Sequence, residues 1–143
     1  MFKISTAVAL SATLLTSWAA AAEAVQPPDE VLLIQGDRQW ADGRLDEARK
    51  SFEQAVANNP QSVAARMKLG GFQLGNNRYS TAVETYQQTI SLDANNAKAW
   101  IGLGMAYLHT GQNELSRAAF GEAIRIDPAR KAQLAQLAEK PVK

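Results

Sequence analysis

The chain repeats itself three times at one constant spacing, and this repeat limits the folds that are open to it. The step from Gly36 to Gly70 equals the step from Gly70 to Gly104. Three further sets keep the same spacing: the aromatics Phe52, Tyr86 and Phe120, the small residues Ala48, Ala82 and Ser116, and the unit ends Pro60, Ala94 and Pro128. Because four kinds of residue share one register, the sequence predicts three copies of one structural unit.

Each unit has the pattern of two amphipathic helices. Its apolar residues recur at intervals of three and four, the period of a helix that is buried on one face. The predicted helices span residues 29–42, 45–58, 63–75, 79–92, 97–110 and 113–126. Glycine or asparagine stands at each corner, where a left-handed residue can end a helix. No segment with period two is long enough for a strand, so the sequence predicts an all-α fold.

The unit resembles the tetratricopeptide repeat, a helix-turn-helix of about 34 residues. The third copy carries most of that family's pattern: Trp100, Leu103, Gly104, Tyr107, Phe120, Ala123 and Pro128. Leu32 and Arg66 stand where the first and second copies would carry the tryptophan. The resemblance implies three units, 29–62, 63–96 and 97–130, stacked as a right-handed α-solenoid.

A stacked array needs covers at its ends, since one unit cannot bury its apolar face alone. After Pro128, the spacing of Leu134, Leu137 and Ala138 predicts a capping helix at about 129–140 that completes a repeat domain spanning 29–143. We expect Lys131, Gln133, Gln136 and Lys140 to face water. If Leu134 and Leu137 fold over the third unit, this helix also prevents copies of the chain from stacking end to end.

The first residues have the pattern of an export signal. One lysine, Lys3, precedes an uncharged run from Ile4 to Trp18, and "WAAAAEA" then offers the small residues that signal peptidase recognises. An uncleaved membrane anchor is the alternative, but the run is short and holds six Ser and Thr residues. We expect a signal peptide at 1–22, cleaved after Ala22 or Ala24, then an extended leader at 23–28. The exported chain would be a periplasmic protein without a membrane span.

Composition argues against several classes of function. Without Lys3, the 15 basic residues fall to 14, equal to the 14 acidic ones, which gives no reason to expect nucleic acid as a partner. The chain has no cysteine, and His109 is its one histidine, so a histidine triad or a metal site lacks partners. "GLGMAYL" lacks the third glycine and the preceding strand of a dinucleotide site. The sequence predicts no enzymatic activity, metal or cofactor.

The resemblance also implies a binding surface. In this family the first helices of successive units line a concave groove that holds a peptide or a partner's helix. Carried over by register, the predicted groove consists of Leu33, Asp37, Met67, Lys68, Lys98, Ile101, Met105 and His109. Gly71 and Gly102 would leave room for the backbone of a partner.

One known mode of binding in the family does not transfer as a set. Some members hold a C-terminal carboxylate with lysine, asparagine and arginine side chains. Lys98 fits one of these positions, whereas the others are occupied by Leu33, Asp37, Lys68 and Gly102.

The sequence therefore favours a protein-interaction adaptor of the cell envelope. It would bind a segment of another envelope protein in the groove and assist the assembly of a complex. One alternative is a structural protein that associates with itself as a homo-oligomer. Another is an enzyme subunit that uses a carboxylate or His109.

Overall fold

The computed structural model describes residues 28–138, which are helical almost throughout. The first repeat holds α2 (Asp29–Ala41) and α3 (Leu45–Asn58), the second α4 (Val63–Gly75) and α5 (Tyr79–Leu92), and the third α6 (Ala97–His109) and α7 (Asn113–Ile126). A 3-10 helix η1 (Pro128–Arg130) and α8 (Lys131–Ala138) follow. The six repeat helices agree with the predicted ones to within one residue, and residues 28–138 contain no strand. The predicted all-α solenoid is confirmed, while the signal peptide, most of the leader and Lys140 lie outside the described residues.

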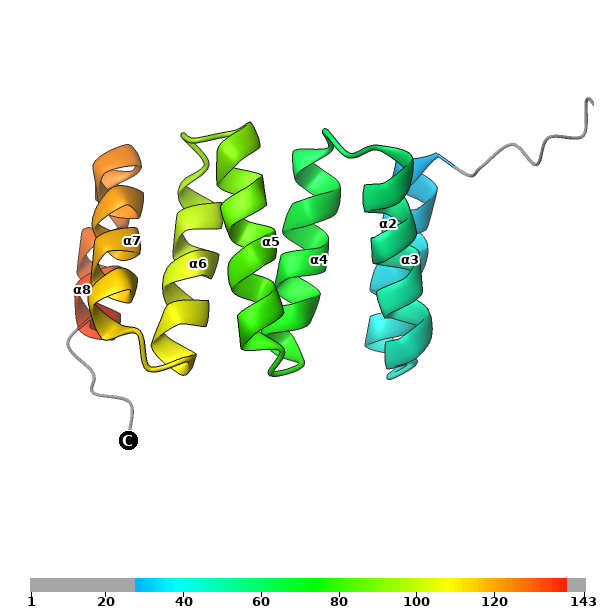
Figure 1. Cartoon of the computed structure of the whole chain (residues 1–143), viewed down its shortest axis with the longest axis horizontal. Coiled ribbons are helices and arrows are strands. Elements are labelled where there is room, and N and C mark those ends of the chain that lie inside the picture. Colours follow the sequence, from blue (N-terminus) through cyan, green and yellow to red (C-terminus); the bar gives the residue numbers. More distant parts are fainter. Residues whose placement is uncertain (1–27, 139–143) are drawn as a thin grey trace, which may run out of the picture.

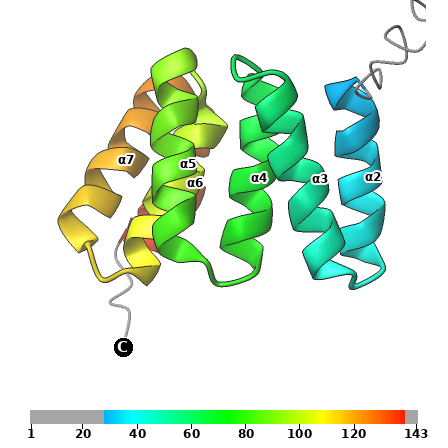
Figure 2. The same ribbon diagram turned by 45° about the vertical axis from the view of Figure 1, so that its right-hand side comes forward.

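The helices form one row in chain order. Figure 1 shows α2 and α3 at one end of the row and α7 with α8 at the other, and the turned view of Figure 2 again has α2 and α7 at opposite ends. Besides its own partner α5, helix α4 contacts both α2 and α6. The first helices of the three repeats therefore adjoin one another along one side of the solenoid.

The corner between the two helices of each repeat is built alike. Gly43, Asn77 and Gly111 have positive φ values of 76°, 60° and 75°. Glycine has no Cβ to clash in this conformation, and asparagine tolerates it better than most residues. The residue after each of them donates a backbone hydrogen bond to the carbonyl five residues before it: Arg44 to Gln39, Arg78 to Gln73 and Gln112 to Tyr107.

A glycine facing an aromatic ring is the central contact of each repeat. A Cβ on Gly36 would lie 2.6 Å from Cε1 of Phe52, and one on Gly104 would lie 2.6 Å from Cε1 of Phe120. The corresponding distance from Gly70 to Cε1 of Tyr86 is 3.0 Å. No side chain fits between helix and ring at these distances, which explains why glycine and aromatic recur together.

Two repeats contain a shielded polar pair that the sequence did not indicate. The Ser51 hydroxyl donates to Oε1 of Gln39 at 2.7 Å, and the Thr85 hydroxyl donates to Oε1 of Gln73 at 2.7 Å. These pairs occupy equivalent positions of the first and second repeats. Each links the two helices of its repeat and satisfies polar atoms that are shielded from water.

Arg66 makes one hydrogen bond equivalent to that of the tryptophan it replaces. In the third repeat, the indole N–H of Trp100 donates to the carbonyl of Ala94 at 2.9 Å. In the second repeat, a guanidinium N–H of Arg66 donates to the carbonyl of Pro60, the equivalent residue, at 2.7 Å. The substitution therefore keeps the hydrogen bond that closes the start of the helix, although Nε of Arg66 is buried without a partner.

The capping helix covers the third repeat. Leu134 is 1% exposed and packs with Phe120 and Ala123, and Leu137 packs against the same cluster. The predicted water-facing residues Lys131, Gln133 and Gln136 are exposed. End-to-end stacking through this end of the solenoid is therefore closed. None of the helices within 28–138 has the length and apolar character needed to cross a membrane.

The helix crossing gives a matched test of stability. Gly104→Ala would force its methyl group into the ring of Phe120 and should lower the free energy of unfolding by roughly 1–3 kcal/mol. Gly121 lies in α7 with nothing within 4 Å of its Cβ position. Gly121→Ala should therefore raise stability by about 0.5–1 kcal/mol, because alanine favours helix. Denaturant unfolding of both variants measures the difference, and equal effects would contradict this placement of the crossing.

Candidate functional site

The apolar residues of the predicted groove lie between surface and core. Leu33 is buried in the cluster that holds Phe52 and Phe72, so it offers little surface to a partner. Met67, Ile101 and Met105 are half-buried. They are therefore accessible in part, but each also stabilises the fold.

These three half-buried side chains contact two different clusters. Met67 packs against the cluster of the second and third repeats that contains Tyr86 and Leu103. Ile101 and Met105 pack against the cluster that contains Leu134 of the capping helix. The apolar part of the groove thus continues from the centre of the solenoid toward its covered end.

The charged residues of the predicted groove are partly neutralised. Nζ of Lys68 lies 2.6 Å from Oδ2 of Asp37, and both side chains are nearly half exposed. This ion pair connects α4 to α2. Lys98 is exposed near the start of α6. The structure thus offers a neutral pair over the first two repeats and a positive charge over the third.

His109 lies at the junction of the second and third repeats. Its imidazole stacks on the phenol ring of Tyr79, with ring centroids 4.3 Å apart and planes 4° from parallel. Tyr79 opens α5, so the contact ties the end of α6 to the preceding repeat. Stacked pairs of this kind contribute to packing. Among residues 28–138, no group of three or more His, Cys, Asp or Glu side chains is arranged to hold a metal ion.

Gly102 does not leave the room that was expected above it. A Cβ on Gly102 would overlap the ring of Tyr86, which occupies this space from α5. Gly102 is a packing residue, and the expectation that it receives a partner's backbone is corrected. Gly71 is different: only the Tyr86 hydroxyl approaches its Cβ position, at 3.9 Å.

The sequence indicated Tyr86 only as a repeated core aromatic. The structure also places it beneath the predicted groove. Its ring lies against Gly70 and Gly102, and its hydroxyl extends to Gly71, so it passes between α4 and α6. Burial raises the pKa of Tyr86 to about 12, because the charged phenolate is costly away from water. The sequence contained a signal for this placement. Gly71 and Gly102 are extra glycines near the repeated ones, and they leave room for the larger ring and hydroxyl of tyrosine.

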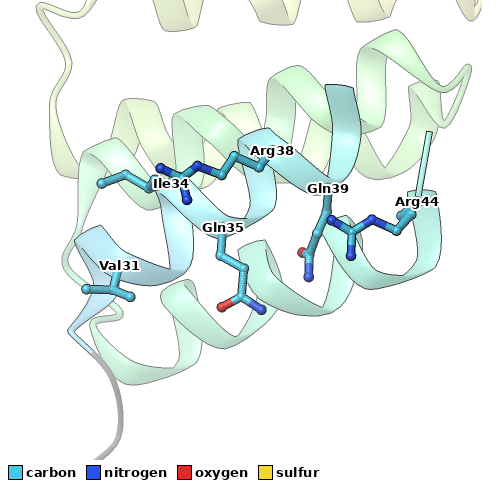
Figure 3. A pocket seen from close by; sticks show the side chains of 6 residues that line it. All are labelled: Val31, Ile34, Gln35, Arg38, Gln39 and Arg44. Atoms are coloured by element: carbon cyan, nitrogen blue, oxygen red, sulfur yellow. The ribbon is translucent and has the colours of Figure 1, made fainter. Parts of the chain in front are cut away.

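Two of the larger hollows in the surface lie outside the concave side. One, of about 380 Å³, opens between α5, α6 and α7 and is lined mainly by apolar residues, including Ile90, Trp100 and Leu115. The other, of about 430 Å³, lies on the outer side of α2 at the uncovered end of the row (Figure 3). The groove prediction included neither.

The buried phenol predicts a pH effect on stability. The pKa of Tyr86 is higher in the folded chain than the ordinary value near 10. The neutral phenol therefore contributes fully to the free energy of unfolding below pH 10, and this contribution is lost as the pH rises to 12. The loss should reach about 2–3 kcal/mol. Tyr86→Phe keeps the ring and should not show this component of the loss. Urea unfolding of both proteins between pH 8 and 12 measures it, and parallel pH profiles would contradict the assignment.

Comparison with known proteins supports this architecture. A family model described as "Tetratricopeptide repeat" matches residues 35–96 and again residues 73–131. The human protein O-mannosyl-transferase TMTC3 is 30% identical over 94 residues, which is 65% of this chain but 10% of that protein. The chain thus spans about a tenth of the length of this relative.

Two solved structures share the fold. The second domain of human RPAP3, determined in complex with an HSP70 peptide, has a TM-score of 0.70 at 18% identity and covers 78% of this chain and 98% of its own. The chaperone SycD of Yersinia enterocolitica, determined with a peptide of the translocator YopD, has a TM-score of 0.70 at 16% identity, covering 77% and 88%. With the family model matched over most of the described residues, the chain belongs to the tetratricopeptide repeat family.

Proposed function

We propose that this protein is a protein-interaction adaptor that binds a segment of a partner along the concave side formed by α2, α4 and α6. The observation that carries the proposal is the set of half-buried apolar side chains on these adjoining helices, Met67, Ile101 and Met105. Flexible methionines adapt to different apolar side chains of a ligand. The two similar structures, which were determined with bound peptides, support the same use of this fold.

The charges of the groove suggest the chemistry of the partner segment. Lys98 is exposed beside the apolar residues, whereas Lys68 is held by Asp37. A segment with large apolar residues followed by an acidic residue would complement this arrangement. Three repeats offer a small contact area, so we expect an affinity in the micromolar range.

The proposal gives His109 a packing role and includes no catalytic step. The stacking of its ring on Tyr79 accounts for its position at the end of α6. A rival in which copies stack end to end has less support, because Leu134 and Leu137 already occupy the end of the third repeat.

A photo-reactive amino acid tests the groove. Placed at Ala64, which is exposed on α4 at the position equivalent to Lys98, it leaves the Lys98 charge intact and should give one crosslinked partner that mass spectrometry identifies. Met67→Ala in the same chain should reduce the crosslinking yield several-fold, because alanine removes most of the apolar side chain that the partner would contact.

A matched position on α5 serves as the control. Gln88 is also exposed but lies on a second helix of its repeat, away from the concave side. The same photo-reactive residue there should give no such adduct. If both positions capture the same partner equally, or if Met67→Ala has no effect, the concave side is not the binding surface.

We further propose that the protein is exported and acts in the periplasm as an adaptor of envelope complexes. The uncharged run behind Lys3 and the small residues around Ala22 support this. Fusion of residues 1–24 to an alkaline phosphatase, which is active only after export, should give enzyme activity, and Leu10→Arg in the apolar run should abolish it. Intact mass should place the new N-terminus at Glu23 or Val25, whereas an uncleaved chain would contradict the proposal.

A further inference from the structure

The outer side of α2 is an inter-repeat surface that no other described repeat covers. Val31, Gln35 and Arg38 occupy the same repeat positions as Ala65, Leu69 and Phe72 in α4 and as Ala99, Leu103 and Ala106 in α6. All six of these equivalents are buried. They are buried because a preceding repeat packs on them, and within residues 28–138 α2 has no preceding repeat.

This surface keeps an apolar character although it faces solvent. Val31 is 49% exposed and Ile34 is 54% exposed, the two highest values among the exposed large hydrophobic residues between 28 and 138. Together with Gln35, Arg38, Gln39 and Arg44 they line the hollow of about 430 Å³ on this side (Figure 3). Gln35 and Arg38 make the rim polar. A polar rim is typical of a surface that is covered in a complex and exposed to water in the free chain.

A stripe of α2 at the edge between this surface and the concave side is self-complementary in charge. Glu30, Ile34 and Arg38 are spaced by four residues, so they form one stripe along α2 with an acid, an apolar residue and a base in that order. Glu30 and Arg38 are exposed. None of the ion pairs within residues 28–138 uses either of them. Both charges are therefore available to a partner.

We propose that two copies of this chain associate head to head through α2, with the two helices antiparallel. A twofold axis at Ile34 brings Ile34 against its counterpart and places Glu30 of each copy level with Arg38 of the other. A parallel arrangement would instead place like charges together. Because the two surfaces are identical, the contact closes on itself as a dimer.

The other end of the solenoid limits the assembly to two copies. The capping helix α8 covers the third repeat, with Leu134 fully buried beneath it. The dimer contact borders the concave side, because Glu30 and Ile34 occupy the repeat positions of the groove residues Lys98 and Lys68. The two proposals are separated by their readouts: the dimer is measured as self-association of the purified chain, and the groove as crosslinking to another protein.

The contact area is small, so the dimer should be weak. One helix face covers less than the roughly 800 Å² per partner of a standard interface. We expect a dissociation constant on the order of 10–100 μM and a dimer that is populated in concentrated solution.

Sedimentation equilibrium of residues 23–143 over 5–500 μM measures the association. Ile34→Glu should leave a monomer at every concentration, because it places two like charges at the axis. Leu115→Glu is the matched control: Leu115 is 47% exposed on α7 at the far side of the molecule, and this variant should dimerise as before. Circular dichroism of both variants confirms that they remain folded.

Charge reversal tests the orientation. Arg38→Glu or Glu30→Arg alone should weaken the dimer at least several-fold, since each juxtaposes like charges. The double variant Glu30→Arg, Arg38→Glu restores opposite charges across an antiparallel pair and should recover the association. A double variant as weak as the single ones would overturn the antiparallel arrangement.

Disulfide trapping tests the axis directly, because the chain has no cysteine of its own. Ile34→Cys should give a covalent dimer under mild oxidation, since residues at a twofold axis approach to disulfide distance. Leu115→Cys should not. The proposal is overturned if the wild-type chain remains a monomer up to 500 μM, or if Ile34→Glu and Leu115→Glu change the association equally.

Discussion

The close contact between a glycine and an aromatic ring holds each repeat together. A ring from the second helix lies on the bare backbone of the first, so the helices approach more closely than two ordinary side chains would permit. Phe52 and Phe120 make this contact at their own glycines, Gly36 and Gly104. The corner residues, the apolar spacing and the length of the loops all serve to bring ring and glycine together. Once these are in place, the remaining side chains pack around a geometry that is already set.

Tyr86 extends this contact from one repeat to the next. Its ring reaches both its own glycine, Gly70, and Gly102 of the following repeat. The second and third repeats therefore share one aromatic residue, and Met67 packs against the same cluster. As a result, the part of the concave side that we assign to binding is joined to the part of the core that links these repeats. A substitution of Met67 that is meant to alter binding will therefore also change the packing between the second and third repeats.

The fold could be predicted from the sequence because its determinants repeat. Four kinds of residue at one spacing predicted the three repeats, and apolar residues at intervals of three and four predicted the two helices of each. What could not be predicted depends on contacts between particular side chains. The stacking of His109 on Tyr79 joins two repeats and follows no repeated pattern, since Gly75 and Leu45 occupy the equivalent positions one repeat earlier.

The sequence predicted which positions along the chain belong to the candidate site, but not how deeply their side chains are buried. Register placed Met67, Ile101 and Met105 on the first helices of their repeats, but the degree of their burial depends on neighbours such as Tyr86 and Leu134. Gly102 shows the limit most clearly. Its lack of a side chain is equally suited to a bound ligand and to an internal ring, and only the three-dimensional arrangement distinguishes the two.

The difference between the two ends of the solenoid has a consequence for how such a chain can lengthen by gene duplication. A new repeat placed before α2 would meet Val31 and Gln35, whose equivalents in α4 and α6 are covered by the preceding repeat. A new repeat placed after α7 would first have to displace α8, which is folded onto Phe120 and Ala123. Within residues 28–138, α2 therefore presents the surface on which a further repeat could pack without displacing another helix.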